Sequence, residues 1–130
     1  MTQDDKDLLL QDLCARLPYG VKVESVFINT DTKKRKSCGI EVFDATCILM
    51  IRDGFGEFKP YLFPLSSMTD KQKNEYQYIT ERWMNDPAYS ISDSIDWLNE
   101  NHFDYRGLIE KGLAIDATGT DIYDIPEELL

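Results

Sequence analysis

The segment that decides the fold reads Val21-Lys22-Val23-Glu24-Ser25-Val26-Phe27-Ile28. Its first half alternates apolar and charged residues, which is the period of a β-strand whose successive side chains point to opposite faces of a sheet. The preceding Pro18-Tyr19-Gly20 combines a proline that cannot continue a helix with a glycine that permits a reversal of the chain. A strand over residues 21–28 therefore starts the predicted sheet.

Two further strands are predicted after a polar connection over residues 29–36. The first covers residues 37–43. The second covers residues 45–52 and is apolar on both faces, which is typical of a central strand that is covered from both sides.

A last strand is predicted over residues 57–65, after a hairpin turn at Asp53-Gly54. Pro60 and Pro64 cannot donate hydrogen bonds to a neighbouring strand, which favours an edge position for this segment. The first half of the chain thus predicts a small antiparallel sheet of about three to four strands.

One helix is predicted before the sheet and two after it. Residues 4–17 place leucines at helical spacing, with acidic residues in the first turn, where the helix dipole favours anions. Residues 69–85 and 90–101 each begin with a Ser or Thr that precedes an amide or acid by three positions, which is the pattern of a capping box. The predicted class is therefore α+β, with an N-terminal helix and a small antiparallel sheet packed with two or three C-terminal helices.

The predicted domain organisation is a single α+β domain over residues 1–115. Within it, residues 102–115 read either as a helical turn or as a buried loop, because Gly107 and Gly112 bracket a short apolar piece. Residues 116–130 are rich in acids and contain a glycine and a proline, which predicts a loosely docked or mobile tail.

The net charge of -10 is unevenly distributed along the chain. Residues 1–65 contain 9 basic and 10 acidic side chains, whereas residues 66–130 contain 5 and 14, so the two halves carry charges of -1 and -9. Such a surface repels nucleic-acid phosphates at long range, and we expect no direct binding to nucleic acid. A protein partner with a basic surface is favoured instead.

The cysteines and the terminal sequence predict a cytoplasmic location. Cys14, Cys38 and Cys47 form no closely spaced pair, and an odd number cannot be satisfied by internal disulfides alone. Reduced thiols in the cytoplasm are the simplest account, with Cys14 and Cys47 as small buried hydrophobes. The first residues lack the basic start and apolar stretch of a signal peptide, and the longest apolar run is far shorter than the ~20 residues of a membrane helix.

Three segments, residues 7–21, 59–69 and 96–109, carry a resemblance to a known family. They include Leu17-Pro18-Tyr19-Gly20-Val21, Lys59-Pro60-Tyr61-Leu62-Phe63-Pro64 and Asp96-Trp97-Leu98-Asn99, followed by His102-Phe103-Asp104-Tyr105-Arg106-Gly107. Together they resemble a family of uncharacterised proteins encoded by Bacteroides-type gut bacteria and by their prophages and other mobile elements. The resemblance implies a small cytoplasmic accessory protein and implies no activity, cofactor or catalytic residue.

The second half of the chain has more aromatic residues than its predicted helix stripes can bury. Tyrosine, tryptophan and arginine dominate the hot spots of protein interfaces. The predicted binding residues are therefore Tyr89, Trp97, His102, Asp104, Tyr105 and Arg106.

His102 is the one histidine of the chain and supports two interpretations. It lies at the end of the last predicted helix, where a side chain of this type can bond the final carbonyls and interact favourably with the helix dipole. Alternatively it acts as a base beside Asp104 and Arg106, in a small hydrolase or a nucleotide-acting enzyme. That alternative requires the three side chains to converge on one concave, partly apolar pocket.

Two charged groups are interpreted as surface features. Asp93, Asp96 and Glu100 form a stripe on one helix face that matches no known cation-binding loop, so we predict a solvated face and no metal. The basic run from Lys33 to Lys36 is short and lies in a predicted loop, where it favours solubility. No cofactor is predicted.

The favoured function is that of a non-enzymatic protein-binding or regulatory accessory factor, acting through its acidic, aromatic C-terminal half. A special case is mimicry of nucleic acid, in which carboxylates copy the spacing of phosphates and occupy a basic groove. A third reading is a homo-oligomer that buries the same aromatic face.

Overall fold

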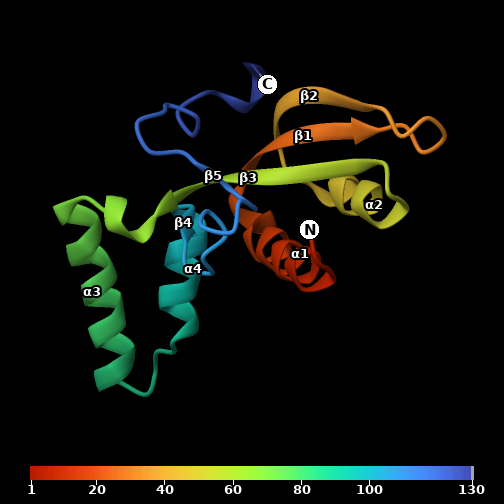
Figure 1. Ribbon diagram of the computed structural model, residues 1–130. Coiled ribbons are helices and arrows are strands. Elements are labelled where there is room, and N and C mark those ends of the chain that lie inside the picture. Colours follow the sequence, from red (N-terminus) through yellow and green to blue (C-terminus); the bar gives the residue numbers. More distant parts are fainter. Residues whose placement is uncertain (130) are drawn as a thin grey trace.

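The computed structural model describes residues 1–129 and has the predicted α+β class. Short 3₁₀ turns occur at Leu17–Tyr19, Leu65–Ser67 and Glu127–Leu129. The helices and strands follow one another in the order α1 (Gln3–Arg16), β1 (Lys22–Ile28), β2 (Arg35–Val42), α2 (Ala45–Asp53), β3 (Gly56–Pro64), α3 (Asp70–Asn85), α4 (Ser92–Glu100), β4 (Phe103–Asp104) and β5 (Ile115–Asp116) (Figure 1). Within residues 1–129, no helix has the length and apolar character that a membrane crossing requires.

The sheet has five strands and is mixed rather than purely antiparallel. β1 pairs antiparallel with both β2 and β3, as the sequence predicts for its first half. β4 and β5 are two-residue strands that pair parallel with β3, after the long crossover through α3 and α4. The segment after residue 102 therefore extends the sheet, which the local sequence does not indicate.

The predicted edge position of β3 is wrong for residues 61–64, which pair with β4 and β5 and place β3 inside the sheet, whereas residues 56–60 pair with β1 alone. The N–H of Ile28 donates to the carbonyl of Phe55 (2.8 Å), and hydrogen-bonded pairs alternate along an antiparallel ladder. By this alternation Pro60 lies opposite Val23 at a position that exchanges no hydrogen bonds. Pro64 is the last residue of β3. Neither proline therefore interrupts the ladder with β1.

The predicted strand over residues 45–52 is also wrong, because this segment is helix α2. The Asp44 side chain caps its first turn by accepting a hydrogen bond from the N–H of Cys47 (3.1 Å). Gly54 ends it in a left-handed conformation, with φ of 77°. A short apolar run fits a buried strand and a buried helix equally well, and here the two caps decide for the helix.

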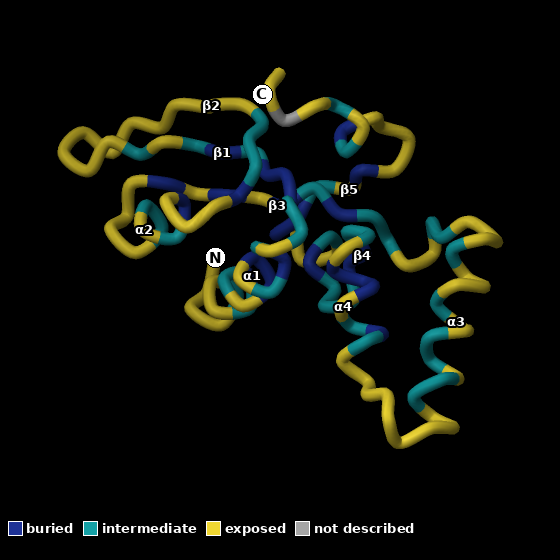
Figure 2. Tube along the Cα trace, turned by 180° about the vertical axis from the view of Figure 1, so that it is seen from behind, coloured by how far each residue is buried: buried dark blue, intermediate teal, exposed yellow. Residues whose placement is uncertain are grey.

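The main core lies between the sheet and the two helices α1 and α2, which lie on the same side of it (Figure 1). Figure 2 shows buried residues concentrated along β1, β3 and the inner side of α1. Cys47 lies in this core as predicted, whereas Cys14 is exposed and its predicted burial is wrong. A second cluster, built around Trp97, Leu98 and Phe103, connects α4 and β4 to the base of α3.

A buried ion cluster connects α1 to the turn after β4. The carboxylate of Asp12 accepts hydrogen bonds from Arg16 Nε (2.9 Å) and from Arg106 (2.7 Å). Arg16 also donates to the carbonyl of Phe103 (2.6 Å), and the side chains of Asp12 and Arg16 are completely buried. One residue of α1 thus holds together two cations that lie 90 residues apart in sequence.

The segment after β5 packs on the face of the sheet opposite α1. Lys22 points to that face and donates to the carbonyls of Ile122 (2.7 Å) and Ile125 (2.5 Å). The hydroxyl of Tyr123 donates to the carbonyl of Tyr61 (2.5 Å) and accepts from the N–H of Lys22 (3.2 Å), so it bridges β1 and β3. Within the predicted tail, the described residues 117 and 122 are buried.

Substitution of Asp12 tests the buried ion cluster. Asp12→Asn removes the anion between two arginines, and loss of one partner of a buried ion pair costs about 3–5 kcal/mol. We expect a loss of this size in the free energy of unfolding, measured by urea denaturation. Asp53→Asn is the matched control, because Asp53 pairs with Arg52 on the exposed surface, and its effect is expected to be much smaller. Equal effects of the two substitutions would contradict the role of Asp12.

Candidate functional site

Helices α3 and α4 form a hairpin that projects from the body of the protein (Figures 1 and 2). We call this hairpin, residues 70–100, the arm. α3 leaves the carboxyl end of β3, and α4 returns the chain to β4. None of the residues of α3, all of which the structure describes, is buried. A helix with so little burial depends on its neighbour for stability, so the contact between α3 and α4 decides the shape of the arm.

Two contacts hold the arm together. At its base, Tyr76 of α3 packs on Trp97 of α4, with ring centroids 5.5 Å apart, and Trp97 stacks on Phe103 at 5.7 Å. Further out, the hydroxyl of Ser94 accepts a hydrogen bond from Trp83 Nε1 (2.8 Å) and lies 3.1 Å from the hydroxyl of Thr80. Ser94 is buried between the helices, so this polar contact fixes their register.

The outer part of the arm exposes four large side chains with apolar surface. Tyr78 is 65% exposed, Met84 67%, Tyr89 41% and Ile91 59%. The guanidinium of Arg82 lies 4.3 Å from the centroid of the Tyr89 ring and 5.7 Å from that of Tyr78. We call these five residues the arm tip. Its composition of tyrosine, methionine and arginine is the one that protein interfaces enrich.

The surroundings of the arm tip are acidic. Glu81 and Asp86 are exposed on the same part of the arm. The charge of Arg82 is directed at the two tyrosine rings, where cation–π attraction holds it. The tip therefore combines an apolar centre with a negative rim.

The structure separates the aromatic residues that the sequence groups as a binding set. Tyr89 is exposed and belongs to the arm tip. Trp97 is 8% exposed and fills the second core, so it offers no surface to a partner. The Tyr105 hydroxyl donates to Asn99 (2.8 Å), and its ring lies between the guanidinium groups of Arg16 and Arg106, at 5.3 and 4.6 Å from its centroid. Tyr105 therefore supports the buried ion cluster.

The three side chains of the enzyme hypothesis point into separate environments. Asp104 accepts hydrogen bonds from the backbone N–H groups of Leu108 (3.1 Å) and Ile109 (2.9 Å) and so shapes the turn after β4. Arg106 pairs with Asp12, as described above. The ring of His102 stacks on Tyr123, with centroids 3.6 Å apart and planes at 8°. The convergence that the hypothesis requires is not observed.

His102 is a half-buried neutral side chain rather than a cap for the end of α4. Its backbone has φ of 63°, in the left-handed region, which turns the chain sharply from α4 into β4. Burial, reinforced by the charges of Arg16 and Lys22, lowers the pKa of His102 to about 4. At neutral pH it is uncharged, and its interaction with Tyr123 is a stacking contact.

The remaining candidate residues are the acidic stripe of α4 and Cys47. Across residues 1–129, no three His, Cys, Asp or Glu side chains are placed to hold a metal ion. Of the predicted stripe, Asp96 and Glu100 are exposed, in agreement with a solvated face, whereas Asp93 is half-buried and accepts a hydrogen bond from the N–H of Ser90 (3.4 Å). Burial is the largest of the effects that raise the pKa of the Cys47 thiol to about 12, which keeps it protonated.

Sequence reasoning missed most of the arm tip. It selected Tyr89 and overlooked Tyr78, Arg82, Met84 and Ile91. The available signal was position: Met84 and Ile91 flank the turn at Asn85-Asp86-Pro87, and side chains at the free end of a helical hairpin have few neighbours.

The buried state of His102 predicts a pH dependence of stability. Its pKa is lower in the folded protein (about 4) than in the unfolded chain (6.5), so the folded state binds fewer protons. The contribution of neutral His102 to the free energy of unfolding is complete above pH 6.5. It is lost as the pH falls to 4, and the total loss is about 3 kcal/mol.

The control for this prediction is His102→Asn, because asparagine tolerates the left-handed backbone. The free energy of unfolding of the wild type and of His102→Asn is measured by urea denaturation between pH 7 and about pH 4. As the pH falls, it should decrease more steeply in the wild type. Parallel curves for the two proteins would show that His102 does not titrate in this range.

No family model, curated protein or solved structure matches the chain. The resemblance to proteins of gut bacteria and their mobile elements therefore stays a prediction.

Proposed function

We propose that the protein is a binding factor that recognises another protein through the arm tip, without catalysing a reaction. The observation that carries the proposal is the stack of Tyr78, Arg82 and Tyr89 on the outer part of the arm, next to exposed Met84 and Ile91. Single exposed apolar residues are normal on protein surfaces. Here five interface-type residues gather on an element that projects away from the core.

The arm tip is pre-organised for binding. Stacking against Arg82 restricts the ring of Tyr89, so less side-chain entropy is lost when a partner covers it. The hydrogen bond between Trp83 and Ser94 fixes α3 against α4 below the tip. A rigid aromatic centre of this kind is typical of interface hot spots, whose truncation costs more than about 2 kcal/mol in binding free energy.

The acidic rim indicates the chemistry of the partner. An apolar partner surface bordered by Lys or Arg would complement the apolar centre and the exposed carboxylates Glu81 and Asp86. Rim charges act chiefly on the association rate and are screened by salt. Moderate salt should thus weaken binding moderately, whereas mimicry of nucleic acid through many carboxylates should give a steep salt dependence.

The test is affinity capture from a Bacteroides-type lysate with the full chain, at low and at moderate salt. The arm variant carries Tyr89→Ala and Ile91→Ala. Two hot-spot truncations should weaken partner binding by at least about tenfold, because each costs more than about 1 kcal/mol. The matched control is Leu49→Ala, which truncates an apolar residue of similar exposure (49%) on α2. Circular dichroism checks that all three proteins are folded.

A protein captured by the wild type and by Leu49→Ala, and lost with the arm variant, supports the proposal. Its affinity is then measured with purified components. Equal capture by wild type and arm variant would place the interface elsewhere. If purified wild type and arm variant bind the captured protein equally well, the arm tip is not its binding site.

A further inference from the structure

One edge of β3 is left without a neighbouring strand along its first half. Residues 56–60 pair with β1 alone among the described strands, and β5 begins to pair only at Tyr61. Hydrogen-bonded pairs alternate along the β1–β3 ladder, and the bond from Ile28 to the carbonyl of Phe55 sets their phase. The N–H and carbonyl of Phe58 therefore point away from β1, toward the free edge.

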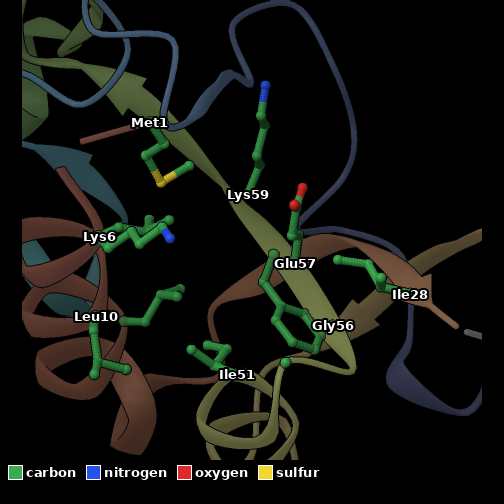
Figure 3. A pocket seen from close by; sticks show the side chains of 12 residues that line it. Met1, Lys6, Leu10, Ile28, Ile51, Gly56, Glu57 and Lys59 are labelled. Carbon is green, nitrogen blue, oxygen red and sulfur yellow. The ribbon is translucent and has the colours of Figure 1, made fainter. Parts of the chain in front are cut away.

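The free edge borders a cavity of about 280 Å³ between β3, α1 and the end of α2 (Figure 3). α1 contributes one of its faces, with Leu9, Leu10 and Leu13 at helical spacing. Ile51 closes the cavity from the side of α2. The lining also includes Gly56 and Phe58, the two residues whose backbone groups point to the free edge.

This arrangement leaves backbone hydrogen-bonding groups next to an apolar wall. Buried backbone N–H groups in proteins are almost always paired, and an unpaired one costs free energy. Phe58 is 3% exposed, and its N–H points away from β1 to an edge where no other described strand pairs with residues 56–60. A group that fills the cavity should thus supply both a hydrogen-bond acceptor and an apolar side chain.

The charge at the cavity is positive. The charged residues of its lining are Lys6, Glu57 and Lys59. Both carboxylate oxygens of Glu57 accept from Arg35, with 2.7 Å to Oε1, so this anion is already engaged. Lys6 extends from α1 toward the cavity (Figure 3) and forms no ion pair within residues 1–129. Of the charged residues at the start of α1, Asp4, Asp5, Lys6 and Asp7, Lys6 alone lines the cavity, so it is the charge that a bound group meets there.

We propose that the groove between α1 and the free edge of β3 binds an extended peptide segment of a partner protein, which adds a strand to the sheet beside residues 56–60. An apolar side chain of the peptide fills the space between Leu10 and Ile51, and a neighbouring acidic side chain pairs with Lys6. Backbone hydrogen bonds supply affinity in this mode, and side-chain pockets supply specificity.

The geometry favours a peptide over a small cofactor. The cavity lies just under the ~300 Å³ at which pockets for drug-sized ligands begin. It is open along a strand edge, which a continuous chain can follow. This groove lies at the first half of β3, whereas the arm follows its carboxyl end, so the two surfaces are separate and their tests are independent.

The test selects random heptapeptides displayed on phage against the full chain. Leu10→Trp, which fills the cavity, serves for counter-selection. An enriched peptide is synthesised with a fluorescent label, and binding is measured by anisotropy. We expect an apolar residue next to an acidic one in the enriched sequences, and at least tenfold weaker binding by Leu10→Trp. Lys6→Gln should weaken binding severalfold, and Lys71→Gln on the arm, the matched charge control, should leave it unchanged.

Hydrogen exchange reports on the backbone contact directly. Saturation with the peptide should slow exchange of the Phe58 amide at least tenfold in the wild type. A bound peptide that leaves this amide unchanged would overturn the proposal, and so would a selection that enriches nothing over Leu10→Trp. Lys6→Gln alters an exposed residue and keeps the test valid if Leu10→Trp fails to fold. Sodium nonanoate is the small-molecule arm, and displacement of the peptide by nonanoate at equal affinity would reassign the groove to small carboxylates.

Discussion

The contact on which the rest of the structure depends is the carboxylate of Asp12 between Arg16 and Arg106. Three charged groups buried in one place are costly unless each has a partner, and the cluster satisfies that condition by bringing α1 to the turn after β4. Arg16 also holds the carbonyl of Phe103, so the short strand β4 is fixed at the same point. After the arm, the chain rejoins the sheet where β4 pairs with β3. Because Arg16 holds β4 at this point, the cluster connects the two halves of the chain.

A second set of contacts locks the sheet from its other face. Tyr123 bridges β1 and β3 through its hydroxyl, at the place where their direct pairing ends. His102 stacks on the ring of Tyr123. Lys22 donates hydrogen bonds to two backbone carbonyls of the segment that contains Tyr123. The residues that resemble a catalytic set in the sequence therefore serve packing, since His102 is uncharged and stacked on Tyr123, and both Asp104 and Arg106 are engaged by internal partners.

The same strand organises both of the proposed binding surfaces. At its carboxyl end β3 leads into the arm, whose outer part carries the stacked tyrosines and Arg82. Along its first half β3 has a free edge beside an apolar cavity. We propose a protein partner for each surface, bound by the aromatic residues of the arm tip in one case and by strand addition in the other.

The sequence by itself determined the features that depend on neighbouring residues. The strand over residues 21–28, the helix before it, the capping box at Thr69 and the α+β class follow from alternation, helical spacing and caps. The apolar run at residues 45–52 could not be decided by its period, because the caps at Asp44 and Gly54 determine α2. Only the tertiary structure decided that β3 is central, that Trp97 is buried and that Tyr89 is exposed, because these outcomes depend on contacts between segments far apart in the chain. The partner of Asp12 at residue 106 and the free edge at Phe58 belong to this second group, since no local pattern records which surfaces the fold leaves uncovered.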